Sequence, residues 1–185
     1  MTMSKTNDKV IVKATPALKS YLSTKGIINY GIPTAIVCLP IYYFLTKGPM
    51  PLINIAGDIF LSVLITVFIC ALTCVPGIKG DIKKGKAPAA ALEKTEHPVY
   101  KHIAGSLVGQ AIEFAILAMF IFAMIPGGIL AAVATMSGNT ELAIGKTAYW
   151  ILKSIYSGVF VNYAMRWVTH NTLAQYQKSL GTQVY

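Results

Sequence analysis

Long apolar runs that carry almost no charge are the feature that most limits what this chain can fold into. Hydrophobic residues make up 55% of its 185 positions and charged residues only 12%, about half the share usual in soluble domains. The runs also lack the regularly spaced polar positions of an amphipathic surface helix. We therefore expect an all-α integral membrane protein.

Four of these runs are long enough to cross about 30 Å of hydrocarbon as helices. They are expected to form two hairpins, one in 27–75 and one in 103–168, separated by a polar segment at 76–102. The four predicted transmembrane helices are 27–45, 53–75, 103–125 and 149–168.

The two ends of the chain are predicted to lie outside the membrane. Residues 1–26 form a polar tail, and residues 169–185 form a second one. Within the first tail, Pro16 suits the first turn of a helix, so 16–25 is predicted to be a short helix that lies at the membrane surface.

Two prolines mark expected helix boundaries. Pro76 is followed by Gly77, and this pair is predicted to end the second transmembrane helix. Pro126 interrupts the third apolar run, and the segment 126–136 is too short to cross a membrane by itself. The sequence leaves two conformations open for it: a helix that continues past a kink, or a segment that folds back at the outer surface.

The basic residues predict the orientation of the four helices. Lysines are concentrated in the first tail and in the segment 76–102, whereas the predicted outer loops hold only Lys47 and Lys146. Cytoplasmic loops carry an excess of Lys and Arg. We therefore expect both termini and the segment 76–102 in the cytoplasm, and the chain in the cell (plasma) membrane.

The net charge of +9 points to lipid rather than to nucleic acid. A nucleic-acid surface usually clusters Arg with aromatic residues, but Arg166 is the one arginine among 16 basic residues. Anionic lipid headgroups are the expected partner. Assembly into a homo-oligomer or a larger membrane complex is also expected. The basic loop is predicted to contact lipid through Lys79, Lys83, Lys84 and Lys86.

Glu113 is the most notable polar residue, because it lies near the middle of the third predicted transmembrane helix. Ionisable groups at this depth cost several kcal/mol unless they are paired, hydrated or neutral. A carboxyl group that gains and loses a proton is what a proton-coupled carrier needs. The alternative is a Glu that only packs, hydrogen-bonded to Gln110, to Asn162 or to a tyrosine. Gln110 and Asn162 lie at similar depths and are predicted to bridge the third and fourth helices.

Asp58 and Lys153 are predicted to form an ion pair. Each lies about 8 Å below the outer end of its helix at 1.5 Å per residue. Such a pair is either a clamp between helices or a gate for a substrate or ion, and an alternative is that Lys153 extends to the interface. The side of the second helix that carries Asp58 is predicted to face protein, together with Ser62, Thr66, Ile69 and Thr73.

Small residues predict close contacts between helices. Gly105 and Gly109 form a GxxxG motif, and Ser154 and Gly158 offer a matching surface on the fourth helix.

The leading functional hypothesis is a small membrane protein that transports, or helps to transport, a small solute or ion with proton coupling. The alternative is an accessory or scaffold subunit that binds lipid or protein through its basic loop. A membrane enzyme would depend on Glu96, His97 and His102. No metal and no cofactor is expected.

Overall fold

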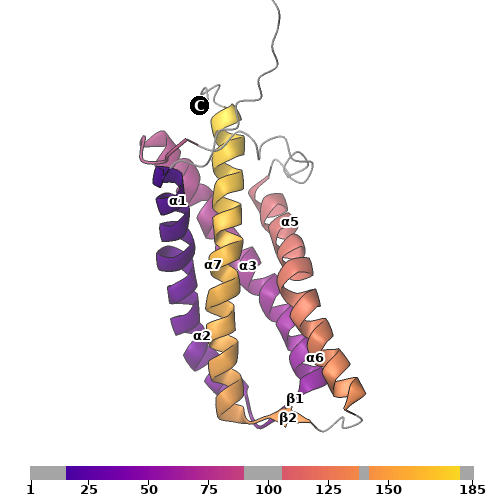
Figure 1. Cartoon of the computed structure of the whole chain (residues 1–185). Coiled ribbons are helices and arrows are strands. Elements are labelled where there is room, and N and C mark those ends of the chain that lie inside the picture. Colours follow the sequence, from indigo (N-terminus) through magenta and orange to yellow (C-terminus); the bar gives the residue numbers. More distant parts are fainter. Residues whose placement is uncertain (1–15, 90–105, 138–141, 180–185) are drawn as a thin grey trace, which may run out of the picture.

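The computed structural model describes residues 16–89, 106–137 and 142–179, and these residues are almost entirely helical. They form four long helical rods and one short two-stranded ribbon (Figure 1). In chain order the elements are α1 (Pro16–Ser23), η1 (Thr24–Gly31), α2 (Ile32–Leu45), β1 (Met50–Pro51), α3 (Leu52–Lys83), α5 (Leu107–Met119), η3 (Phe120–Met124), α6 (Ile125–Met136), β2 (Ala143–Ile144) and α7 (Lys146–Ser179).

The elements α1, η1 and α2 follow one another without a break and form the first rod. The predicted separation of a surface helix at 16–25 from a transmembrane helix at 27–45 is therefore not seen. Its middle part, η1, is a π-helix. A π-helical turn fits this position because Pro33 has no backbone N–H to donate to the carbonyl four residues earlier.

The helix α3 continues through Pro76 to Lys83, so the predicted end at Pro76-Gly77 is wrong. Neighbouring contacts hold its last turns in place. Ile78 is fully buried, and the Asp81 carboxylate lies 2.7 Å from Lys25 Nζ and accepts a hydrogen bond of 2.7 Å from the Tyr21 hydroxyl. A proline inside a helix removes one hydrogen bond, and packing of this kind offsets that loss.

The elements α5, η3 and α6 form the third rod, which runs from Leu107 to Met136. Of the two conformations left open for 126–136, the structure has the continuing helix. Pro126 cannot donate to the Phe122 carbonyl, and the Tyr156 hydroxyl of α7 donates a hydrogen bond to that carbonyl instead. The bend at Pro126 is thus completed by another rod.

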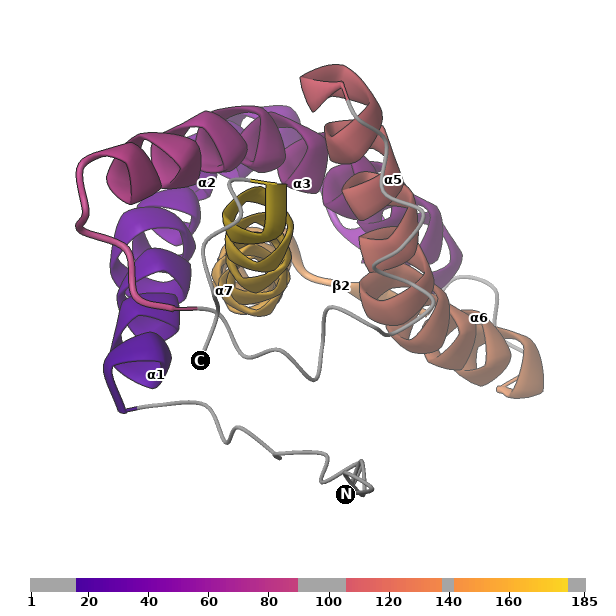
Figure 2. The same cartoon turned by 90° about the horizontal axis from the view of Figure 1, so that it is seen from above.

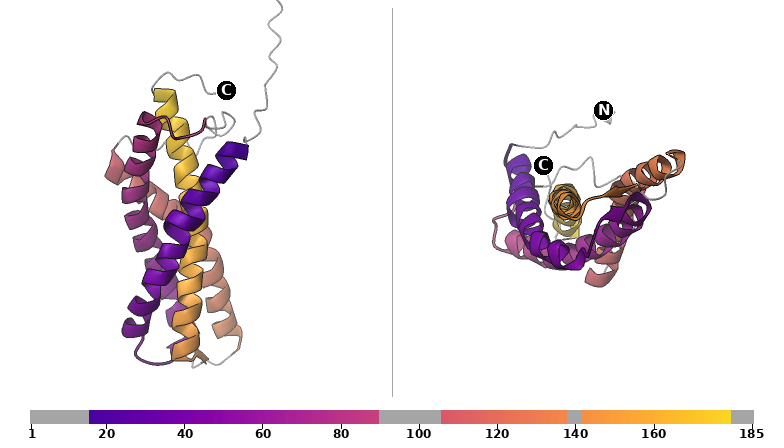
Figure 3. Two further views of the ribbon diagram at one scale, coloured as in Figure 1. Left: turned by 90° about the vertical axis from the view of Figure 1, so that its left-hand side faces the viewer. Right: turned by 90° about the horizontal axis from the view of Figure 1, so that it is seen from below.

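The helix α7 lies inside an arc made by the first rod, α3 and the third rod (Figure 2). The first rod crosses α7 at an angle, and the same arc appears from below (Figure 3). The start of α1, the end of α3, the start of α5 and the end of α7 all lie at one end of the molecule (Figure 1).

The ribbon joins the connecting segments at the other end. β1 pairs with β2 in an antiparallel manner, with Met50 opposite Ile144 and Pro51 opposite Ala143. This ribbon was not among the elements predicted from the sequence.

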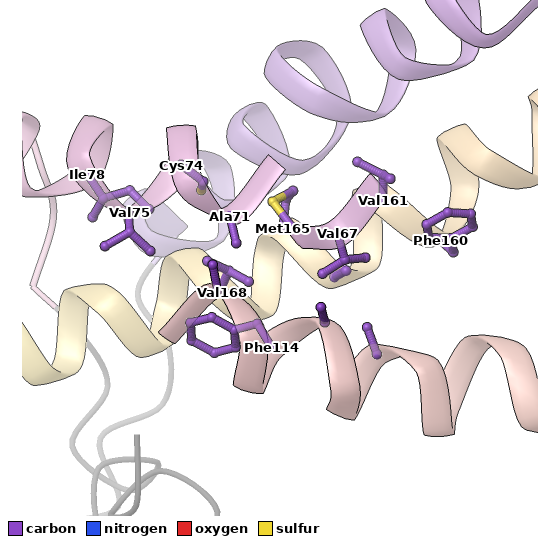
Figure 4. Packing of buried hydrophobic residues seen from close by; sticks show 14 of the residues in the cluster. Val67, Ala71, Cys74, Val75, Ile78, Phe114, Phe160, Val161, Met165 and Val168 are labelled. Atoms are coloured by element: carbon purple, nitrogen blue, oxygen red, sulfur yellow. The ribbon is translucent and has the colours of Figure 1, made fainter. Parts of the chain in front are cut away.

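The apolar core lies where α3, α5 and α7 meet (Figure 4). Small residues on α5 allow close packing, since Ala111, Ala115 and Ala118 are buried. Phe114 packs edge to face on Trp167 of α7, with ring centroids 5.0 Å apart. The other labelled core residues are Val67, Ala71, Cys74, Val75, Ile78, Phe160, Val161, Met165 and Val168.

Three helices in the described part of the chain are long and apolar enough to cross a membrane: Ala17–Leu45, Leu52–Lys83 and Leu107–Met136. Together with the helical content, they agree with the predicted all-α membrane protein. α7, which contains the fourth predicted transmembrane helix, is not among them. Its polar residues lower its hydropathy, and many of them are enclosed by the other rods.

Candidate functional site

The ion pair predicted between Asp58 and Lys153 is present, and it joins α3 to α7. The Tyr149 hydroxyl donates a second hydrogen bond to the same carboxylate oxygen that Lys153 contacts. Both donors come from α7, because Tyr149 and Lys153 are four residues apart and share one face of the helix.

The charged end of Lys153 is also shielded by aromatic rings. Its Nζ lies 4.0 Å from the centroid of the Tyr42 ring and 5.7 Å from that of Tyr149, which are cation–π distances. The Tyr42 hydroxyl and Ser157 Oγ lie 3.1 Å apart and share a hydrogen bond. We call this group, which consists of Asp58, Tyr149, Lys153, Tyr42 and Ser157, the Lys153 clamp.

The Lys153 clamp links α7 to both α2 and α3. The matching depths of Asp58 and Lys153 predicted its ion pair, but Tyr42, Tyr149 and Ser157 were not predicted. Tyr149 and Ser157 had a detectable signal, since they lie four positions before and after Lys153. Tyr42 had none, because an aromatic residue near a helix end is also typical of a membrane interface.

The structure does not bring Asn162 and Gln110 together, so the predicted bridge between their helices is wrong. The Asn162 side chain faces the first rod: a Cβ atom added at Gly26 would lie 2.6 Å from Asn162 Oδ1. Gln110 is buried on α5 and 8% exposed. Glu113 is half-buried on the same helix.

Gly158 of α7 packs closely against the first rod. A Cβ added at Gly158 would lie 2.8 Å from Ala35 Cβ and 2.9 Å from the Gly31 carbonyl oxygen. Ser154 is buried and donates a hydrogen bond of 2.8 Å to the Trp150 carbonyl in its own helix.

Gly109, the second glycine of the GxxxG motif, lies in the first turn of α5. Gly109 donates its backbone N–H to Ser106 Oγ at 3.1 Å, which makes Ser106 the N-cap of α5. Gly105 lies outside the described residues, as do Glu96, His97 and His102.

The polar side predicted for α3 divides between two neighbours. Asp58 faces α7 in the Lys153 clamp. Thr66, Ile69 and Thr73 line a groove of about 310 Å³ between α3 and the first rod. Ile69 and Thr73 are exposed, so other parts of the protein cover only some of the side of α3 that was predicted to face protein.

From Asn162 onward, α7 carries several buried polar atoms for which the described residues supply no hydrogen-bond partner. These atoms are Asn162 Oδ1, Arg166 Nε, Asn171 Oδ1 and Thr172 Oγ1. The other end of the Arg166 guanidinium is anchored, because Nη2 donates to Ser23 Oγ at 3.2 Å. Buried polar atoms in proteins are usually paired with protein or with ordered water, so these atoms, which lie on several sides of α7, are positions where water can bind.

The lysines of the basic loop fall into two groups. Lys83, Lys84 and Lys86 are exposed around a turn at Gly85, whose φ is +66°. Lys79 is half-buried, and its Nζ lies 5.6 Å from the centroid of the Tyr176 ring on α7. Three of the four predicted lipid-binding lysines are therefore accessible.

Comparison of the chain with known protein families, with curated proteins and with solved structures finds no match.

Proposed function

We propose that this protein has four transmembrane helices and moves a small polar solute or an ion along α7, with proton coupling. The observation that carries the proposal is the set of unpartnered polar atoms on α7, inside an arc of three apolar rods. Asn162 and Arg166 fall within the fourth predicted transmembrane helix, 149–168, where such atoms are costly unless water or a ligand binds them. A hydrated path along α7 supplies that partner.

The outer surface of α7 supports its place as the fourth transmembrane helix. An exposed stripe on this helix is apolar or aromatic and is formed by Leu152, Ile155, Val159 and Tyr163. Exposed apolar stripes of this length are unusual in water but are normal against lipid. This stripe fits a side of α7 that lies against the bilayer. Asn162 and Arg166 continue the same side of the helix further along, where the first rod contacts them.

The arrangement of the helix ends supports the proposed orientation. An even number of crossings places the start of α1, the end of α3, the start of α5 and the end of α7 on one side of the membrane. The exposed lysines Lys83, Lys84 and Lys86 lie at that end, and the positive-inside rule assigns it to the cytoplasm. The proposed location is the plasma membrane.

In this proposal the Lys153 clamp closes the path at the end near the β1–β2 ribbon. Lys153 is held by Asp58 and Tyr149, and release of this ion pair would leave a charged amine facing α3. Glu113 is the proposed proton-accepting group, on account of its half-buried position in an apolar helix.

The test is a flux measurement in liposomes that contain the purified protein and an internal pH-sensitive dye. A potassium diffusion potential drives the flux, and added solutes include ammonium, sodium and small amino acids. We expect wild-type flux to fall at least tenfold in Asn162→Leu and in Glu113→Gln. The matched control is Asn54→Leu, which changes an exposed Asn on α3.

Two results would contradict the proposal. The first is a wild-type protein that passes neither protons nor any solute above the level of empty liposomes. The second is an Asn162→Leu variant with full flux, because the polar atoms on α7 then have no part in it.

A second candidate function is an accessory subunit that binds anionic lipid through the basic loop. The observation that favours it is the exposure of Lys83, Lys84 and Lys86 on one turn. The triple variant to Gln should retain less phosphatidylglycerol in native mass spectrometry, with Lys47→Gln, an exposed lysine at the other end, as the control. Equal retention by the two variants excludes this role for the turn.

A further inference from the structure

A pocket of about 340 Å³ lies between α3, α6 and α7, directly beside the Lys153 clamp. Its walls come from three parts of the chain that are distant in sequence. Its lining includes Ile55, Ile59, Pro126, Leu130, Leu152 and Lys153.

The polar groups at the walls of this pocket already have partners. Lys153 and Tyr149 both contact Asp58, and the Tyr156 hydroxyl donates to the Phe122 carbonyl. The rest of the lining is aliphatic. A ligand here therefore gains free energy from burial of apolar surface rather than from an ion pair, and a neutral hydrocarbon fits this lining best.

The pocket opens on the surface that lipid would cover. Leu152 is 56% exposed at its edge, next to the apolar stripe of α7. An apolar cavity of about 150 Å³ holds one benzene molecule. A pocket of about 340 Å³ thus has room for about a dozen carbon atoms, which is most of the length of a lipid chain.

We propose that this pocket binds one acyl chain of a membrane lipid. The proposal rests on the membrane location of the helices, but not on transport. The chain contacts Tyr149 and Lys153 of the clamp on one wall and Pro126 at the bend of the third rod on another. Occupancy therefore keeps water away from the Asp58–Lys153 ion pair and holds α6 beside α7.

The test is photo-crosslinking in nanodiscs made with phosphatidylcholine that carries a diazirine on one acyl chain. Labelled positions are read by peptide mass spectrometry. The diagnostic position is Ile55, which lines the pocket and is only 5% exposed, so bulk lipid does not reach it otherwise. We expect label at Ile55 and at Leu130 in the wild-type protein.

Two variants of α3 separate the pocket from the general lipid surface. Ile59→Trp fills the pocket and should lower the label at Ile55 at least fivefold. Ile65→Trp is the matched control, because Ile65 is 47% exposed on the same helix and does not line the pocket; it should leave that label unchanged. If Ile59→Trp does not fold, Leu130→Phe fills the pocket from α6.

The proposal is overturned if Ile55 is unlabelled in the wild-type protein, or if its label survives in both pocket-filling variants. The labelling result does not depend on transport. Asn162 lies outside the pocket, so Asn162→Leu should keep full label at Ile55 even if this variant loses flux.

Discussion

The hydroxyl of Tyr156 on α7 donates a hydrogen bond to the carbonyl of Phe122, the group that Pro126 deprives of its helical partner. This contact lets the third rod bend without leaving a polar backbone group unpaired among apolar side chains. It also ties the bend to α7, the helix that carries the polar residues.

Tyr156→Phe removes only the hydroxyl and should therefore destabilise the fold. A buried carbonyl left without a donor costs about 1–3 kcal/mol. We therefore expect the free energy of unfolding, measured by denaturant titration in detergent, to fall by about that amount. Tyr163→Phe, on an exposed ring of the same helix, is the control and should change stability by less than about 0.5 kcal/mol. Equal stability of the two variants would show that another donor serves the Phe122 carbonyl.

The ion pair of the Lys153 clamp should show strong coupling in a double-mutant cycle. Asp58→Asn leaves the Lys153 ammonium enclosed without its counter-charge, and loss of one partner of a buried pair costs about 3–5 kcal/mol. We expect the lower end, about 3 kcal/mol, because the Asp58 side chain remains 29% exposed.

The double variant Asp58→Asn with Lys153→Met should recover part of this loss, since it removes the unpaired charge as well. Unfolding free energies of the four proteins in mild detergent give the coupling. Additive losses would mean that the two charges do not interact in solution.

Gly158→Ala tests the close contact between α7 and the first rod. The added Cβ would lie 2.8 Å from Ala35 Cβ, so the rods must separate, and overpacking of this kind costs about 1–3 kcal/mol. Gly57→Ala is the matched control on α3, where an added Cβ meets nothing within 4 Å. Thermal unfolding should therefore shift down for the first variant only. A lower midpoint for both would indicate a general effect of helix glycines.

Thiol labelling tests the four-helix topology. In a chain with Cys38, Cys70 and Cys74 replaced by Ala, a single cysteine at Lys84 and a single cysteine at Lys47 should react with an impermeant maleimide from opposite faces of sealed vesicles. Both lysines are exposed and lie at opposite ends of the helices. Reaction of both from the same face would exclude the proposed crossing of the membrane by α3.

The apolar runs predicted most of the rods, because an uncharged stretch of sufficient length needs no partner to be recognised. The helix ends were harder to predict. Pro76 and Pro126 are helix breakers in water, and whether a helix continues past them depends on contacts from elsewhere: Tyr21 and Lys25 beside Asp81, and Tyr156 at Phe122. Such contacts have no local pattern in the sequence.

The candidate site was predictable to the same extent. The depth of a residue along its helix can be read from the sequence, and it was enough to pair Asp58 with Lys153. The rotation of a helix about its axis cannot be read in this way. Gly26, Gly31 and Gly158 set how α7 meets the first rod, and this contact turns Asn162 away from Gln110.

The antiparallel pairing of Met50 with Ile144 fastens the entry into α7 to the entry into α3. The described residues contain no second ribbon of this kind at the opposite end. A tilt of α7 about the ribbon would therefore displace each residue in proportion to its distance from the ribbon. Asn171 and Thr172 would move farther than Lys153 in such a movement.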